Sequence, residues 1–200
     1  MAFLTLWLMA TARAQTVPVM ITVQPTSQTV VELQPATFLV GAVGDPLPAY
    51  QWYQNDLPID GATNASYFLA SAPLSDQNAA FYVVASNLVT NVSYVVTSEV
   101  ARLVVVADRI SPTLYRLLPP FGATVRGLGE IEVDFSEPVS GVDASDLLIN
   151  GIPATSVEVY PPVSYVFNFP QPATGLVEVV WSASHGITDL AASANPFTGA

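Results

Sequence analysis

The chain has 200 residues, of which 51% are apolar and 10% are charged, so it holds enough apolar material for one or two folded domains. Sixteen acidic residues against five arginines give a net charge of −11, and a surface of this sign repels the phosphates of nucleic acids and of anionic lipids. The arginines are scattered and cysteine is absent, which excludes nucleic-acid binding, disulfides, thiolate catalysis and cysteine-based zinc sites.

The first fourteen residues have the character of an export signal. Residues 2–12 are mainly apolar, and Ala12-Arg13-Ala14 has the small-x-small pattern that signal peptidase cuts, which predicts cleavage before Gln15. No Lys or Arg precedes the apolar run, so either Met1 is not the true start or the signal is a weak one. The alternative is a buried first strand. Export predicts a protein that is secreted or held at the cell surface, without membrane insertion after cleavage, because no other segment approaches the ~18 apolar residues of a span.

We expect an all-β first domain over residues 15–107. Apolar runs alternate with turn signals, and no continuous helical periodicity appears. The expected strands are residues 17–23, 29–31, 37–43, 50–55, 66–69, 80–86 and a long run over 92–106, with a hairpin turn at Asp60-Gly61. Trp52 lies at the centre of one strand, where its indole is expected to fill the space between two sheets.

Five short motifs of this domain occur together in one protein family. They are Val23-Gln24-Pro25, Ala36-Thr37-Phe38, Tyr50–Asn55 around Trp52, Ile59–Thr63 and Val83–Asn87. Together they resemble the cysteine-free, I-set-like immunoglobulin-like (Ig-like) domains of bacterial exported proteins. The resemblance implies a sandwich of two β-sheets pinned by the tryptophan.

In the cysteine-containing versions of this family, a disulfide joins the two sheets beside the tryptophan. By the resemblance, Val40 takes the first cysteine position, and Val84 takes the second if Tyr82 is the corner tyrosine. If Phe81 is the corner residue instead, the second position moves to Val83. A shift by one residue turns a strand over, so the two alternatives place opposite faces of this strand in the core.

The second domain is expected over residues 108–200, because Asp108–Thr113 interrupts the β pattern with a proline. Residues 131–139 alternate, with Ile131, Val133 and Phe135 on one face and Glu130, Glu132 and Asp134 on an exposed face. Asn150-Gly151 predicts a hairpin turn. Further strands are expected over residues 165–169 and 176–181, with a closing segment from Ile187.

The segment Phe135–Leu147 is followed by Asn150-Gly151, an aromatic strand, Gly175-x-Val177-x-Val179 and Ile187-Thr188-Asp189. This series resembles the bacterial Ig-like modules of surface-layer and biofilm-adhesin proteins. In that family a final strand follows the last Asp, whereas residues 195–200 are turn-like. We therefore expect the polypeptide to be the front of a longer protein, or the second domain to be incomplete at its C-terminus.

Four acids of the second domain are weak candidates for a calcium site, namely Glu137, Asp143, Asp146 and Asp189. Calcium takes six to eight oxygen ligands from flexible loops, but the spacing matches no EF-hand pattern. Scattered acids on an acidic protein are usually solvated, so we predict no metal site and no cofactor.

Two catalytic arrangements were considered. His185 is the single histidine and has Ser182, Ser184 and Asp189 near it in sequence, but nearness in sequence supplies neither a strained nucleophile nor an oxyanion hole. Glu130, Glu132 and Asp134 lack the apolar cleft that raises the pKa of a glycosidase acid. We predict that the chain is not an enzyme.

These expectations favour two tandem Ig-like sandwiches that form a non-catalytic extracellular structural or adhesion module, with a protein or glycan partner at the cell surface. The first alternative is the accessory region of a secreted, polysaccharide-acting enzyme whose catalytic domain lies beyond residue 200. The second is a carbohydrate-binding module that uses Tyr50, Tyr53 and Tyr67 as an aromatic platform, although aromatic residues on strands more often pack within the sheet.

Overall fold

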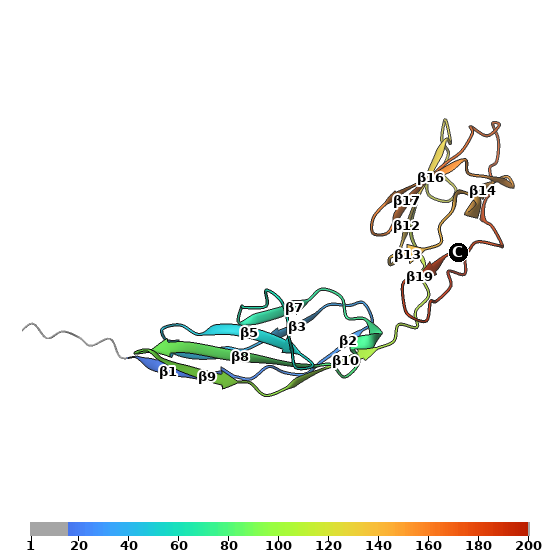
Figure 1. Ribbon diagram of the computed structural model, residues 1–200. Helices are drawn as coiled ribbons and strands as arrows, with labels where there is room; N and C mark the ends of the chain where they lie inside the picture. The colour runs from blue at the N-terminus through green and yellow to red at the C-terminus, as the bar shows by residue number, and fades with distance from the viewer. Residues whose placement is uncertain (1–15, 200) are drawn as a thin grey trace, which may run out of the picture. The chain divides into compact units, whose positions relative to one another are not determined.

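The computed structural model describes residues 16–199, so the predicted export signal lies outside the described residues (Figure 1). The chain divides into two compact units, of which the first ends at Val106 and the second begins at Ala107. In the described part of the chain there is no α-helix, and the only helical segments are two single turns of 3-10 helix. The prediction of an all-β, Ig-like fold is therefore confirmed. None of the helical segments described is long and apolar enough to cross a membrane.

The first unit is built from ten short strands. They are β1 (Val17–Val23), β2 (Gln28–Val31), β3 (Ala36–Leu39), β4 (Gly41–Asp45), β5 (Ala49–Gln54), β6 (Leu57–Pro58), β7 (Ser66–Leu69), β8 (Ala80–Val89), β9 (Val92–Thr97) and β10 (Ala101–Val106). One sheet has the order β2-β10-β8-β5-β6, with β9 also paired to β8. The pairs β1-β4 and β3-β7 form the other layer, and β2 runs parallel to β10.

The core of the first unit surrounds Trp52, whose side chain is 0% exposed. The ring of Phe38, from the opposite layer, stacks on Phe81 with centroids 4.4 Å apart and lies 6.4 Å from the indole. The indole Nε1 donates a hydrogen bond of 2.9 Å to the carbonyl oxygen of Asn64, so the polar atom of this buried side chain is satisfied. The predicted role of the tryptophan is confirmed.

Strand β8 takes the second of the two predicted registers. Phe81 and Val83 face the core, whereas Tyr82 and Val84 lie on the other face, so the expectation of Tyr82 as corner residue and Val84 in the core is wrong. The reason is packing: Phe81 stacks on a ring of the opposite layer, and Tyr82 stacks instead on Tyr53 outside the sandwich, with centroids 5.0 Å apart.

Two further expectations for the first unit are corrected. The hairpin between β5 and β6 turns at Asn55 and Asp56, both at positive φ, and not at Asp60-Gly61. The run over residues 92–106 is two strands, because Ser98 interrupts it. The Oγ of Ser98 accepts a hydrogen bond from the N–H of Val83, and the N–H of Ser98 donates one to the carbonyl oxygen of Val83.

The second unit contains β11 (Leu114–Leu118), β12 (Glu130–Phe135), β13 (Val139–Ser140), β14 (Leu147–Ile149), β15 (Ile152–Pro153), β16 (Ser156–Tyr160), β17 (Ser164–Asn168), β18 (Val179–Trp181) and β19 (Thr188–Asp189). A four-stranded sheet has the order β11-β12-β17-β16, and a three-stranded sheet has the order β15-β14-β18. Strands β13 and β19 form a separate pair. The side chains of Val133, Phe135 and Phe167 are fully or almost fully buried in the core.

The sequence prediction for this unit holds in part. Asn150 and Gly151 both have positive φ and close the β14-β15 hairpin as expected. Strands β11 and β16 were not expected, and β18 is shorter than the predicted run over residues 176–181. Asp134 is buried rather than exposed, because it pairs with Arg116 on the neighbouring strand β11.

Candidate functional site

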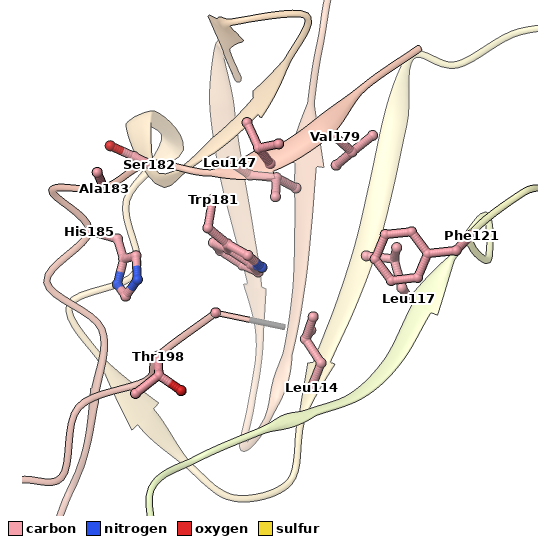
Figure 2. A pocket seen from close by; sticks show the side chains of 12 residues that line it. Leu114, Leu117, Phe121, Leu147, Val179, Trp181, Ser182, Ala183, His185 and Thr198 are labelled. Carbon is pink, nitrogen blue, oxygen red and sulfur yellow. The ribbon is translucent and has the colours of Figure 1, made fainter. Parts of the chain in front are cut away.

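The second unit has a hollow of about 430 Å³ beside Trp181 (Figure 2). One wall comes from β11, through Leu114 and Leu117, and the other comes from β18, through Val179 and Trp181. All four side chains are half-buried and also pack against the core of the unit. The hollow therefore leaves part of the apolar interior open along the side of the sandwich.

A second hollow, of about 630 Å³, continues from the first. It lies between the loop over residues 119–128 and the loop over residues 171–177, and it shares Leu117, Phe121 and Val179 with the first hollow. We call the two hollows together the open groove. Exposed apolar side chains lie along it, among them Phe121 and Leu176, beside polar ones such as Gln171 and Thr174.

The floor of the open groove is aromatic where it passes Trp181. The rings of Phe197 and Phe135 lie 5.0 and 6.0 Å from the indole, and the imidazole of His185 lies 6.2 Å from it. The Nδ1 atom of His185 is buried without a hydrogen-bond partner among the described residues. The histidine therefore belongs to the wall of the groove, a placement that its sequence neighbours did not predict.

The structure does not bring Ser182, Ser184, His185 and Asp189, the residues set aside as a possible triad, into a catalytic arrangement. The Oγ atoms of Ser182 and Ser184 hydrogen-bond to each other at 3.0 Å, and the imidazole of His185 packs against aromatic rings. The carboxylate of Asp189 accepts hydrogen bonds from the N–H and the side-chain amide of Asn195, at 2.8 and 2.7 Å. The carboxylate is therefore occupied in holding a turn.

Two of the four calcium candidates do come together. Carboxylate oxygens of Glu137, Asp189 and Asp108 lie within 4.8 Å of one another. Burial, with the charges of Asp108 and Asp189, raises the pKa of Glu137 above its ordinary value. Carboxylates at such spacing are the donors that calcium uses, but Asp189 already spends both oxygens on backbone and amide donors.

The other two calcium candidates lie apart from this cluster. Asp146 is buried, and its Oδ2 accepts a 2.7 Å hydrogen bond from the N–H of Asp143 at the start of a 3-10 turn. Asp108 was missed because it lies in the predicted inter-domain segment. Asn195 holds Asp108 near Asp189, because its side-chain amide donates hydrogen bonds both to the carbonyl oxygen of Asp108 and to the carboxylate of Asp189.

The acids of β12 form an ion-pair cluster rather than a glycosidase pair. Arg116 donates from Nε to Asp134 Oδ2 at 2.6 Å and also pairs with Glu132. Hydrogen bonds from Arg116 and Ser164 lower the pKa of Asp134. A carboxylate held in its charged form in this way is unsuited to be the proton donor of glycoside cleavage.

The tyrosine platform, considered only as an alternative, is not formed, because the three tyrosines lie on two faces. Tyr50 and Tyr67 pack against the core of the first unit, and the ring of Tyr67 lies 6.4 Å from that of Trp52. Tyr53 stacks on Tyr82 on the outer face, with an interplanar angle of 2°. The structure bears out the favoured expectation that aromatic residues on strands pack within the sheet, Tyr50 and Tyr67 against the core and Tyr53 against its neighbour Tyr82.

Strand β9 of the first unit is an exposed edge. Within residues 16–199 it pairs with β8 alone, and five of its six residues are exposed, with Val95 at 63%. No charged residue occurs between Asp76 and Glu99, although the whole chain carries a net charge of −11. Natural edge strands are usually protected by charges, prolines or bulges, so β9 has the character of a surface that pairs with another molecule.

No family model matches the chain, and no curated protein matches it. Among solved structures, the titin domains Z1Z2 in complex with telethonin are similar over 86% of this chain and 93% of that one, at 15% identity and a TM-score of 0.40. The Ig1-2 module of the Drosophila receptor protein tyrosine phosphatase DLAR is similar over 85% of this chain and 93% of its own, at 16% identity and a TM-score of 0.38. A chimeric titin Z1Z2 carrying a decorin peptide covers 46% of this chain and 97% of its own, at 24% identity and a TM-score of 0.39. The assignment of the Ig-like fold rests on the strand order and on the core around Trp52.

Proposed function

We propose that this protein is a non-catalytic Ig-like structural or adhesion module that acts at the bacterial cell surface or outside the cell. The observation that carries the proposal is the uncharged, exposed strand β9 on a strongly acidic chain. Exposed apolar surface of this kind is typical of a contact site for another macromolecule. The partner class is a protein or a glycan of the cell surface.

The cellular setting in this proposal is supported by the sequence. The apolar residues 2–12 and the Ala12-Arg13-Ala14 pattern support export, and the absence of cysteine is compatible with an oxidising exterior because no thiol is at risk. Fusion of residues 1–20 to a reporter enzyme that is active only outside the cytoplasm measures export directly. Ala14→Glu should block cleavage of the fusion.

The contact function is tested by binding of the fluorescently labelled chain, residues 15–200, to intact bacterial cells. The test variant is Val95→Arg, which places a charge on β9, and the matched control is Leu57→Arg, which places the same charge on an exposed position of β6. We expect saturable binding that weakens about tenfold or more in the test variant and is unchanged in the control, since one buried unpaired charge costs more than 1.4 kcal/mol. Equal binding of both variants, or no binding of the wild type, contradicts the proposal.

A further inference from the structure

Among the described residues the two sheets of the second unit are unequal, and the open groove lies beside the end strand of the smaller one. The larger sheet has four strands and ends at β11, whereas the smaller has three and ends at β18. The groove runs between these two end strands, because both contribute its lining. A fourth strand beside β18 would cover the side chains of Leu114 and Leu117, which now lie half-exposed.

Among the described residues, the edge of β18 away from β14 pairs with no other strand, although Thr198 and Gly199 also line this end of the groove. The other edge of β18 pairs with β14, and two bonds fix the phase of that ladder: Asn150 N–H to the carbonyl of Glu178, and Ser182 N–H to the carbonyl of Asp146. Antiparallel ladders bond at alternate residues, so the N–H and C=O groups of Val179 and Trp181 point away from β14. An extended backbone matches donors and acceptors at this spacing.

The charge of the groove limits the strand that fits it. The second unit carries ten of the sixteen acidic residues of the chain, yet none of them lines the groove. The one permanently charged side chain in the lining is Arg126, in the loop over residues 119–128. A strand with apolar side chains at alternate positions is complementary to the apolar walls, and an acidic residue at one end is complementary to Arg126.

We propose that the open groove is a docking site for one extended strand of a partner polypeptide, neutral along its length and acidic at the end beside Arg126. The strand pairs with the free edge of β18 and lays its alternate apolar side chains over Trp181 and Leu117. This site is separate from strand β9 and goes beyond the contact function proposed above. It adds a second surface, in the second unit, with a defined mode of recognition.

The probe for the test is an eight-residue peptide of alternating Thr and Val that ends in Glu, capped at both ends. Two matched controls carry N-methyl groups on the odd or on the even residues, which removes the hydrogen bonds of one backbone edge and keeps every side chain. Binding is measured by calorimetry with the chain of residues 15–200. We expect binding of the unmethylated probe, and a loss of about tenfold or more in one N-methylated control only, because only one peptide edge faces β18.

Two protein variants sharpen the test. Arg126→Ala should weaken the probe that ends in Glu and leave a probe that ends in Gln unchanged, which measures the predicted charge complementarity. Val95→Arg, the β9 variant, should bind both probes as the wild type does. Failure of the probes with intact cell binding would therefore overturn the docking site alone, and the reverse would overturn the contact function alone.

Three results would overturn the docking proposal. Absence of binding shows that the groove takes no strand of this kind. Equal binding of both N-methylated controls shows a general apolar site for small molecules. Sedimentation of the chain alone as a dimer that the probe does not dissociate shows that a second copy covers the groove.

Discussion

The two units enclose their tryptophans to different degrees. Trp52 is 0% exposed and lies between complete layers, with its Nε1 satisfied by a backbone carbonyl. Trp181 lies on β18, the end strand of the three-stranded sheet, and lines the open groove (Figure 2). Both indoles contact other aromatic rings, so the kind of packing is shared. What differs is the presence of a strand on the outer side.

This difference separates stability from recognition within one chain. In the first unit, β2 and β10 extend the sheet beyond β8, and the apolar side chains of the core are buried. In the second unit, the sheet ends at β18, and the side chains that a further strand would bury remain half-exposed. Apolar side chains that stabilise the first unit by being buried therefore have counterparts in the second unit that are partly exposed, and these are the side chains that the proposed docking site uses.

The largest expected effect compares the two tryptophans directly. Trp52→Ala should lower the free energy of unfolding of the first unit by about 3–5 kcal/mol, because it empties a fully buried site. Trp181→Ala should cost the second unit roughly half as much, since the side chain is already partly in contact with solvent. Urea denaturation followed by circular dichroism measures both. Equal losses would show that the groove does not open the core.

Engineered disulfides test the packing of the first unit, whose core is fully covered. Val40→Cys with Val83→Cys should oxidise and stabilise the first unit by about 4 kcal/mol, because both side chains point into the same buried cluster. Val40→Cys with Val84→Cys is the matched control, because Val84 faces outward. Free-thiol titration after air oxidation, together with denaturation, gives the result. Oxidation of the control pair alone would show that Val84, and not Val83, faces the core, which contradicts the register of β8 described above.

Two glycines of the second unit test how tightly its backbone is packed at a distance from the groove. Gly141 has φ +74°, and a Cβ there would lie 2.5 Å from the carbonyl oxygen of Gly186. Gly151 has φ +77° and open space around its Cβ position. Gly141→Ala should therefore cost about 2–3 kcal/mol and Gly151→Ala about 1 kcal/mol, since only the first adds a backbone clash to the strain of positive φ. Thermal unfolding measures both losses of stability, and similar losses in the two variants would show that the backbone at Gly141 shifts to accommodate the added methyl group.

The smallest effects are two pH dependences of opposite sign within the second unit. The pKa of Asp134 is lowered in the folded state, so its contribution to stability is present above the ordinary pKa and is lost as the pH falls through the folded value. Asp134→Asn should destabilise the unit at neutral pH and make no difference in acid. Thermal unfolding between about pH 2 and pH 8 measures the difference.

Glu137 should behave in the opposite way. Its pKa is raised in the folded state by burial and by the neighbouring acids, so its contribution to stability is present below the ordinary pKa and is lost as the pH rises through the folded value. Glu137→Gln should stabilise the unit at neutral pH and have no effect in acid. A stabilisation that persists at low pH would show that the acids do not repel each other.

Most of the strands, the turn at Asn150-Gly151 and the place of Trp52 were open to prediction because they depend on local residue patterns. The Asn150-Gly151 turn is an example, since positive φ at two successive residues selects these residue types. The register of β8 was not decided by sequence, because Phe81 and Tyr82 are both aromatic and only the stacking partner Phe38 distinguishes them. Alternation of side chains along a strand shows which residues share a face, but it does not show which of the two faces packs against the opposite layer.

The candidate groove was hidden for a related reason. It depends on which strands end each sheet, and β11, which forms one wall, was not expected as a strand because it directly follows the proline-containing segment Asp108–Thr113, the expected boundary between the domains. The acid cluster of Asp108, Glu137 and Asp189 was half predicted, because its third member is brought in by the turn at Asn195. Contacts between residues far apart in sequence decide both features.

Amide hydrogen exchange resolved by NMR tests the central claim most directly, because it reads the two edges of β18 separately. An open edge predicts fast exchange of the N–H groups of Val179 and Trp181 and slow exchange of Val180, which bonds to β14. In the first unit, the N–H of Trp52 should exchange slowly, since it donates to the carbonyl of Ala62. Equal protection of all three β18 amides in the chain alone would show that the second sandwich is already closed.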